Sequence, residues 1–244
     1  MAKRKVLIVD KKDNHWQVFL DEFFEDTRAE VHHFDDSPSA GKWIDQNQPD
    51  LAFLYPALVS PGLEQKINVS RARSHDFRLV QIRQSADKTN LSFDCVFEKI
   101  PSLPEFQKVL MNHMPLPDLI SLLVVDDEPG IGAMIKDFLE GRAKPSFEVR
   151  CAGNGKEALE LIEKKMPNVM LMDIKMPEMD GRELYKAIRK KELDIPTIVF
   201  FDAVSTYELS EIHKFGRPAV IEKGSYQGSP PELMHLFKKM AYFG

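Results

Sequence analysis

Short apolar runs alternate with amphipathic stretches along the chain, most clearly in its second half. Five runs there are bounded by turn residues: 119–125, 147–151, 169–172, 197–201 and 219–221. Runs of this length indicate buried parallel strands. The stretches between them have helical spacing, so that Ala158, Leu159 and Ile162 share one face. A last helix is expected to begin at Ser229 and Pro230, because serine caps helices and proline fits their first turn.

The same pattern occurs twice. KVLIVD (5–10) corresponds to SLLVVDD (121–127), QPDLAFLY (48–55) to MPNVMLMD (166–173), and VFEKIP (96–101) to VIEKGS (220–225). Three motifs in the same order, at an offset of roughly 120 residues, indicate two copies of one domain. Pro115 and Pro117 end the last helix of the first copy. We therefore predict two domains, residues 1–117 and 118–244, each a doubly wound α/β sandwich with a five-stranded parallel sheet.

Charged residues follow three strands of the second copy. Asp126 and Asp127 follow the first strand, Asp173 the third and Lys223 the fifth. The carboxyl ends of the strands in such a sheet form its binding edge, so these four side chains should meet there. Three carboxylates at close range repel one another. Mg²⁺, which takes oxygen ligands and keeps several waters, would relieve that repulsion.

These residues lie in motifs that resemble the receiver domain of bacterial response regulators. The motifs are VVDDEP (124–129), GNGKEAL (153–159), MDIKMPEMDG (172–181) and the lysine of IEKGS (221–225). The resemblance implies a flavodoxin-like fold and phosphotransfer to Asp173 from the phosphohistidine of a histidine kinase. It also implies a Mg²⁺ site formed by Asp127, Asp173 and the backbone carbonyl of Lys175, with Asp126 adjacent or bridged by water. Lys223 would contact the phosphoryl group.

The bland alternative is that the acidic pair caps a helix and the lysine is a solvated surface residue; the matched spacing of all four residues argues against it. A second alternative, an aspartyl-phosphate hydrolase of the haloacid dehalogenase type, needs an aspartate two residues after the nucleophile. Lys175 stands at that position.

The second copy departs from the receiver pattern at its switch. Receivers usually carry Ser or Thr at the end of the fourth strand, where the hydroxyl bonds the phosphoryl group. Here Asp202, or alternatively Phe201, stands at that position. The aromatic residue usual in the fifth strand is replaced by Val220. We therefore expect an intact acceptor with an atypical switch.

The first copy keeps the strands but lacks the residues that metal binding and phosphotransfer require. Asp10 remains of the acidic pair, Lys11 replaces the second acid, and Tyr55 takes the place of the acceptor, while Lys99 is retained. A neutral phenol is a poor partner for Mg²⁺. We therefore expect Mg²⁺ and phosphotransfer in the second copy only.

The first copy is also shorter before its fifth strand. Ser85 fits the hydroxyl position of its fourth strand. The stretch from there to Lys99 is about seven residues shorter than its counterpart, two helical turns. Its fourth helix should be vestigial or absent.

The composition limits the kind of protein and the cellular setting that the sequence allows. Hydrophobic residues make up 43% and charged residues 29%, the net charge is −5, and there are two cysteines. We expect a cytoplasmic, non-enzymatic protein without membrane or nucleic-acid partners and without an output domain. Its partners would be a histidine kinase or phosphotransfer protein, a downstream protein and a second copy of itself. The alternative is a phosphorylation-independent scaffold built from receiver folds.

Overall fold

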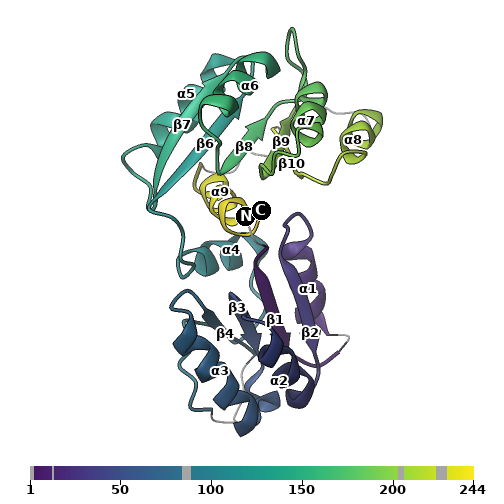
Figure 1. Ribbon diagram of the computed structural model, residues 1–244. Coiled ribbons are helices and arrows are strands. Elements are labelled where there is room, and N and C mark those ends of the chain that lie inside the picture. Colours follow the sequence, from purple (N-terminus) through teal and green to yellow (C-terminus); the bar gives the residue numbers. More distant parts are fainter. Residues whose placement is uncertain (1–2, 13, 84–88, 203–205, 224–229) are drawn as a thin grey trace. The chain divides into compact units, whose positions relative to one another are not determined.

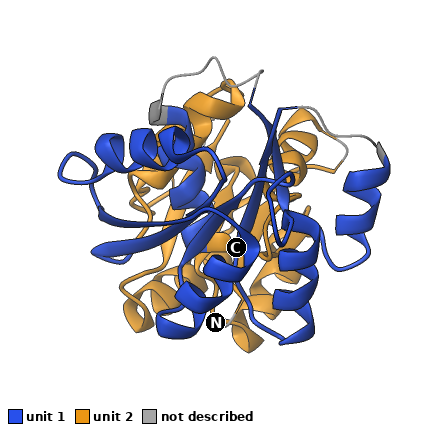
Figure 2. Ribbon diagram, turned by 90° about the horizontal axis from the view of Figure 1, so that it is seen from above, with its two compact units in different colours: residues 1, 116–242, 244 blue, residues 2–115, 243 orange. Residues whose placement is uncertain are grey.

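The computed structural model describes residues 3–12, 14–83, 89–202, 206–223 and 230–244. The chain divides into two compact units (Figures 1 and 2). Residues 2–115 and 243 form the N-terminal unit, and residues 116–242 and 244 form the C-terminal unit. Each unit contains one five-stranded sheet. No helix in the described ranges has the length and apolar character that crossing a membrane requires.

The sheet of the N-terminal unit has the strand order β2-β1-β3-β4-β5, and all pairs are parallel. Phe106 of α4 packs edge-on against Phe19 and Phe23 of α1, with ring centroids 5.0 Å apart in both pairs. A second apolar cluster joins α2 and α3 on the sheet's other face. The strands are β1 (Lys5–Val9), β2 (Glu30–Phe34), β3 (Leu51–Leu54), β4 (Arg78–Ile82) and β5 (Cys95–Phe97), and the helices are α1 (His15–Phe24), α2 (Ser37–Gln46), the short 3₁₀ turn Pro56–Leu58, α3 (Pro61–Arg73) and α4 (Leu103–Met111).

The C-terminal unit repeats this topology, with the order β10-β9-β8-β6-β7 and only parallel pairs. One core cluster packs α5 and α9 on one face of the sheet, and another packs α6, α7 and α8 on the opposite face. The strands are β6 (Leu119–Val125), β7 (Ser146–Ala152), β8 (Val169–Met172), β9 (Thr197–Phe201) and β10 (Ala219–Glu222), and the helices are α5 (Pro129–Leu139), α6 (Gly155–Lys164), α7 (Gly181–Lys190), α8 (Thr206–His213) and α9 (Pro230–Phe243).

The predicted fold class is confirmed, since both units are doubly wound five-stranded parallel sheets. The five strands predicted for the second copy are all present, and only β7 and β10 extend beyond the predicted ends. The last helix begins at Pro230, and Ser229 lies outside the described residues.

The connection between β4 and β5 is short. Its described residues, 83 and 89–94, contain no helix, whereas α8 fills the corresponding connection between β9 and β10. The loss predicted from the spacing therefore holds for these residues.

Candidate functional site

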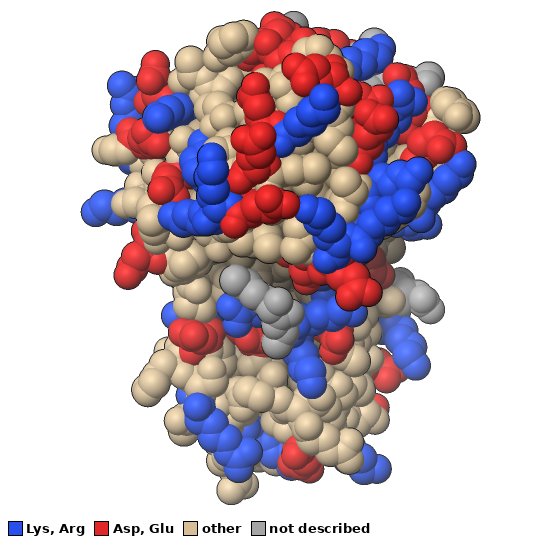
Figure 3. Space-filling model, turned by 45° about the horizontal axis from the view of Figure 1, so that its top comes forward, with Lys and Arg blue, Asp and Glu red and all other residues tan. Residues whose placement is uncertain are grey.

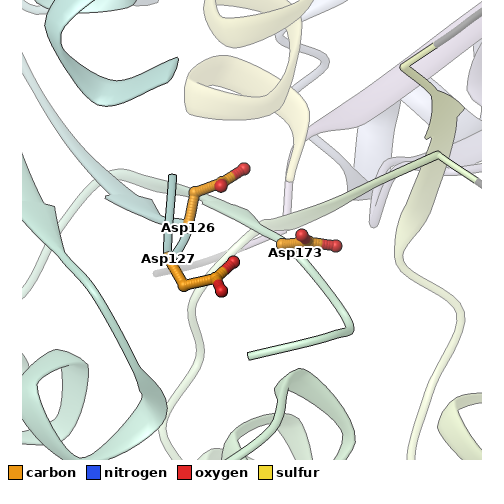
Figure 4. A group of neighbouring side chains, drawn as sticks. All are labelled: Asp126, Asp127 and Asp173. Atoms are coloured by element: carbon orange, nitrogen blue, oxygen red, sulfur yellow. The ribbon is translucent and has the colours of Figure 1, made fainter. Parts of the chain in front are cut away.

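Three carboxylates meet at the carboxyl edge of the C-terminal sheet. Asp126 and Asp127 follow β6 and Asp173 follows β8, and these two strands are neighbours in the sheet. One carboxylate oxygen from each residue lies within 4.8 Å of the others (Figure 4). Asp126 and Asp173 are buried, and Asp127 is exposed. The convergence predicted from the strand ends is therefore present in the structure.

The ammonium of Lys223 lies among these carboxylates. Its Nζ is 3.0 Å from Oδ2 of Asp126 and 3.0 Å from Oδ2 of Asp173. Only 8% of the lysine side chain is exposed, so this ion pairing is largely shielded from water. Two exposed carboxylates lie farther out, Glu128 at 3.7 Å and Asp202 at 4.0 Å from Nζ. The site therefore has an excess of negative charge around one cation.

Burial and pairing shift the proton affinities of the site. Burial raises the pKa of Asp126 above its usual value, and this outweighs the lowering effects of its hydrogen bonds to the Glu128 amide and to Lys223. For Lys223, burial alone would lower the pKa, but the hydrogen bonds to Asp126 and Asp173 raise it above the usual lysine value. Lys223 therefore stays charged at any physiological pH.

The backbone after β8 holds the Asp173 carboxylate in place. The amide of Ile174 donates to Oδ1 at 2.6 Å and the amide of Lys175 at 3.4 Å. Gly181 closes this loop by donating from its amide to the Ile174 carbonyl. A Cβ atom on Gly181 would lie 2.1 Å from the Asp173 carbonyl oxygen, so only glycine fits. With Oδ1 held by the backbone, Oδ2 is the oxygen that faces Lys223.

The donor set fits Mg²⁺. Carboxylate oxygens are its preferred protein ligands, and three carboxylates gather here around the single ammonium of Lys223. Asp126, Asp127 and Asp173 could each supply an oxygen. The role predicted for the Lys175 carbonyl remains a prediction.

The fourth strand brings both candidate switch residues near the site. Phe201 is the last residue of β9 and pairs with Glu222 of β10. The next residue, Asp202, reaches toward Lys223 with a side chain that is 71% exposed. Val220 of β10 is 38% exposed. Neither Phe201 nor Asp202 offers a neutral hydroxyl.

The equivalent edge of the N-terminal unit has a different chemistry. The buried carboxylate of Asp10 is bonded by Nε of Arg83, at 2.9 Å to Oδ1 and 3.1 Å to Oδ2. The Arg83 guanidinium carbon lies 5.4 Å, and the Lys11 ammonium 5.9 Å, from the centre of the Tyr55 ring. Lys99 is exposed. An arginine side chain thus neutralises the single remaining acid.

Arg83 was missed by the sequence analysis, which placed Ser85 at the end of this strand; Ser85 lies outside the described residues. Ile82 pairs with Phe97 in β5, as Phe200 pairs with Ile221 in β10. Because VFEK and VIEK are equivalent motifs, this register makes Arg83 the counterpart of Phe201.

The surface carries charges of both signs. On the face drawn in Figure 3, basic and acidic side chains are interspersed over the C-terminal unit. No single sign dominates that face.

Comparison with curated proteins gives relatives that are mostly longer than the matched region. The chain is 42% identical over 78 residues to Regulatory protein AtoC of Escherichia coli and 43% identical over 82 residues to a protein-glutamate methylesterase/protein-glutamine glutaminase of Nocardioides. These matches cover 32% and 33% of this chain but only 16% and 22% of those proteins. An uncharacterized 14.6 kDa protein of Leptolyngbya boryana is 32% identical over 123 residues, which covers 49% of this chain and 86% of that protein.

Solved structures similar to this chain include receiver and chemotaxis proteins. The receiver domain of the Francisella response regulator 1452 is 30% identical, with a TM-score of 0.44, and the match covers 50% of this chain and 96% of that one. The chemotaxis protein CheY4 of Vibrio cholerae is 25% identical, with a TM-score of 0.44, and the match covers 50% and 98%. Residues 122–232 match the family model described as the response regulator receiver domain. Through these residues, the chain belongs to the response regulator receiver domain family.

Proposed function

We propose that this protein acts in two-component signalling by accepting a phosphoryl group on Asp173 from the phosphohistidine of a histidine kinase or phosphotransfer protein. The observation that carries the proposal is the position of Lys223, whose ammonium bridges Asp126 and Asp173 inside a cluster of three carboxylates. A capping pair and a solvated lysine would not form this buried arrangement.

The residues of the chain divide the chemistry between them. Oδ2 of Asp173 would form the new bond to phosphorus while the phosphorus–nitrogen bond of the donor breaks, and the imidazole nitrogen would keep that electron pair. The Ile174 amide holds Oδ1 and so fixes the direction of Oδ2. The Lys223 ammonium, 3.0 Å from Oδ2, is close enough to turn from the carboxylate to a phosphoryl oxygen. A Mg²⁺ ion held by Asp126, Asp127 and Asp173 would offset the charge on the transferring group.

The consequence of phosphorylation would be a change in binding to another protein, and the chain itself would not act as an enzyme on a further substrate. Self-association is a second outcome of the same kind. A cytoplasmic location fits the two cysteines, Cys95 and Cys151, which are both free.

A phosphorylation-independent scaffold is the second candidate. In the N-terminal unit Arg83 pairs with Asp10 and Tyr55 replaces the acceptor, and in the C-terminal unit Phe201 and Asp202 lack the hydroxyl of the usual switch. In that case the receiver folds would serve only as binding surfaces.

Intact mass spectrometry separates the two candidates. The full chain is incubated with Mg²⁺ and acetyl phosphate, and the wild type should gain the mass of one phosphoryl group. Asp173→Asn, which keeps the size of the side chain and removes the nucleophile, should gain none. If the wild type gains no phosphoryl mass from acetyl phosphate, and none from a phosphorylated histidine phosphotransfer protein, the scaffold is favoured.

A further inference from the structure

The carboxyl edge of the N-terminal sheet is richer in positive charge than the corresponding edge of the C-terminal sheet. At the C-terminal site three carboxylates surround one lysine, a composition suited to a divalent cation. At the N-terminal edge, Asp10 is the retained carboxylate, and Lys11 and Arg83 bring two positive charges. The guanidinium bonded to Asp10 takes over the neutralising role that a metal has in such a pocket.

The Arg83 guanidinium uses only part of its binding capacity. Nε makes both contacts with Asp10, and within the described ranges the two terminal nitrogens have no acceptor. The guanidinium group is planar and binds phosphate oxygens with two nitrogens at once. The side chain of Arg83 is 29% exposed, so part of it is open to solvent.

The backbone holds Arg83 in an unusual conformation. Its φ is 69°, in the left-handed region that non-glycine residues rarely adopt. Its amide donates to the Phe97 carbonyl at 2.8 Å, so the residue is fixed at the end of β4 by β5. Strained positions of this kind persist where the surrounding structure requires them, and they are enriched at ligand sites. From this position the guanidinium reaches both Asp10 and the Tyr55 ring.

We propose that Arg83, Lys11 and the Tyr55 hydroxyl form a binding site for a phosphate-type oxyanion in the N-terminal unit. Arg83 supplies its terminal nitrogens, Lys11 supplies an ammonium, and the phenol supplies a neutral donor. The site lies at the carboxyl edge of a doubly wound sheet, the usual place for ligands in such folds. This inference does not depend on phosphorylation of Asp173.

Inorganic phosphate is the probe that tests the proposal. The full chain carrying Asp173→Asn, in Mg²⁺-free buffer, is titrated with potassium phosphate while its amide resonances are followed, with potassium chloride at equal ionic strength as the blank. Saturable shifts are expected at Lys11, Tyr55 and Arg83 and not with chloride. Arg83→Gln should weaken binding about tenfold or more, because it removes a charge-assisted pair of hydrogen bonds.

A neighbouring lysine provides the matched control. Lys12 has a 76% exposed side chain and pairs with Asp35 at 3.2 Å. Lys11→Gln should weaken phosphate binding severalfold, and Lys12→Gln should leave it unchanged. If Arg83→Gln does not fold, the Lys11 and Lys12 variants decide. The absence of saturable shifts, unchanged affinity in Arg83→Gln or Lys11→Gln, or equal losses in both lysine variants would show that the Arg83–Asp10 pair is only an internal ion pair.

Discussion

The Nζ of Lys223 lies 3.0 Å from Oδ2 of Asp173, so the lysine of the site is already paired with the acceptor before any phosphoryl group is present. The same ammonium is 3.0 Å from Asp126. Both ion pairs are largely shielded from water, because the lysine and the two carboxylates are buried. A cation or phosphoryl group that enters the site must therefore compete with, or redirect, this lysine.

Binding of Mg²⁺ should be confined to the C-terminal unit. Asp127→Ala removes the exposed carboxylate of the cluster without breaking the Lys223 pairs, so it should weaken Mg²⁺ binding and leave the fold intact. Isothermal titration with Mg²⁺ measures the effect, and we expect a loss of about tenfold or more, the scale of one charged contact.

Asp10→Ala is the matched control for that measurement. It removes the acid that Arg83 neutralises in the N-terminal unit, so it should leave the affinity for Mg²⁺ unchanged. Full Mg²⁺ binding in Asp127→Ala, or its loss in Asp10→Ala, would contradict the assignment.

Ionisation of Asp126 should lower the stability of the metal-free protein. Burial raises the pKa of Asp126 in the folded state, so the unfolded chain releases this proton more readily. The cost is absent below the unfolded pKa of about 3.9 and grows until the pH passes the raised folded pKa. The stability of Asp126→Asn relative to wild type in EDTA should therefore rise between pH 4 and pH 7. Denaturant unfolding at the two pH values measures this, and an advantage that grows toward low pH would contradict it.

Gly181 should be intolerant of any side chain. A Cβ atom would lie 2.1 Å from the Asp173 carbonyl oxygen and 2.9 Å from the Ile174 Cα, so Gly181→Ala forces the acceptor loop to move. We expect a loss of about 1–3 kcal/mol in stability, the scale of overpacking, together with impaired phosphorylation.

Gly130→Ala is the control for that experiment. Gly130 lies in α5 with nothing within 4 Å of the added atom, so alanine should be neutral or stabilising there. Equal unfolding midpoints for the two variants would refute the steric argument.

The architecture could be predicted from the sequence because apolar runs and repeated motifs can be read directly along the chain. Five apolar runs marked the strands of the C-terminal unit, and three repeated motifs showed that the N-terminal half has the same fold. The convergence of Asp126, Asp173 and Lys223 followed from strand ends alone.

The burial of individual side chains and the register of the strands could not be predicted from the sequence in this way. Neighbouring Asp126 and Asp127 look alike in sequence, yet Asp126 is buried against Lys223 and Asp127 is exposed. Arg83 was overlooked because the loss of the fourth helix hides where β4 ends, and only the pairing with β5 fixes it. The role of an arginine at that position depends on a side chain reaching across the sheet to Asp10, a contact 73 residues apart in sequence.

The coupling between phosphorylation of Asp173 and output should depend on the residues that end the fourth strand of the C-terminal unit. A ligand shifts an equilibrium only by its different interaction with the two states. Asp202 and Phe201 provide no hydroxyl that could bond a phosphoryl group, and the Asp202 carboxylate, 4.0 Å from Lys223, would repel one. A neutral hydrogen bond contributes about 0.5–1.5 kcal/mol, and more with a charged partner. Asp202→Thr should therefore increase the effect of phosphorylation on α8 and β10.

Hydrogen exchange of residues 206–223, with and without phosphorylation of Asp173, measures this coupling. Phe201→Thr, made in parallel, shows which of the two positions carries the switch, since Phe201 ends β9 and Asp202 lies beyond it. Asp118→Thr is the control, because it removes an exposed carboxylate at the opposite end of the sheet, just before β6. We expect the control to behave as wild type and at least one of the two strand-end variants to show a larger change. A large change in the wild type that neither variant alters would mean that the signal leaves the site by another route, such as the loop after Asp173.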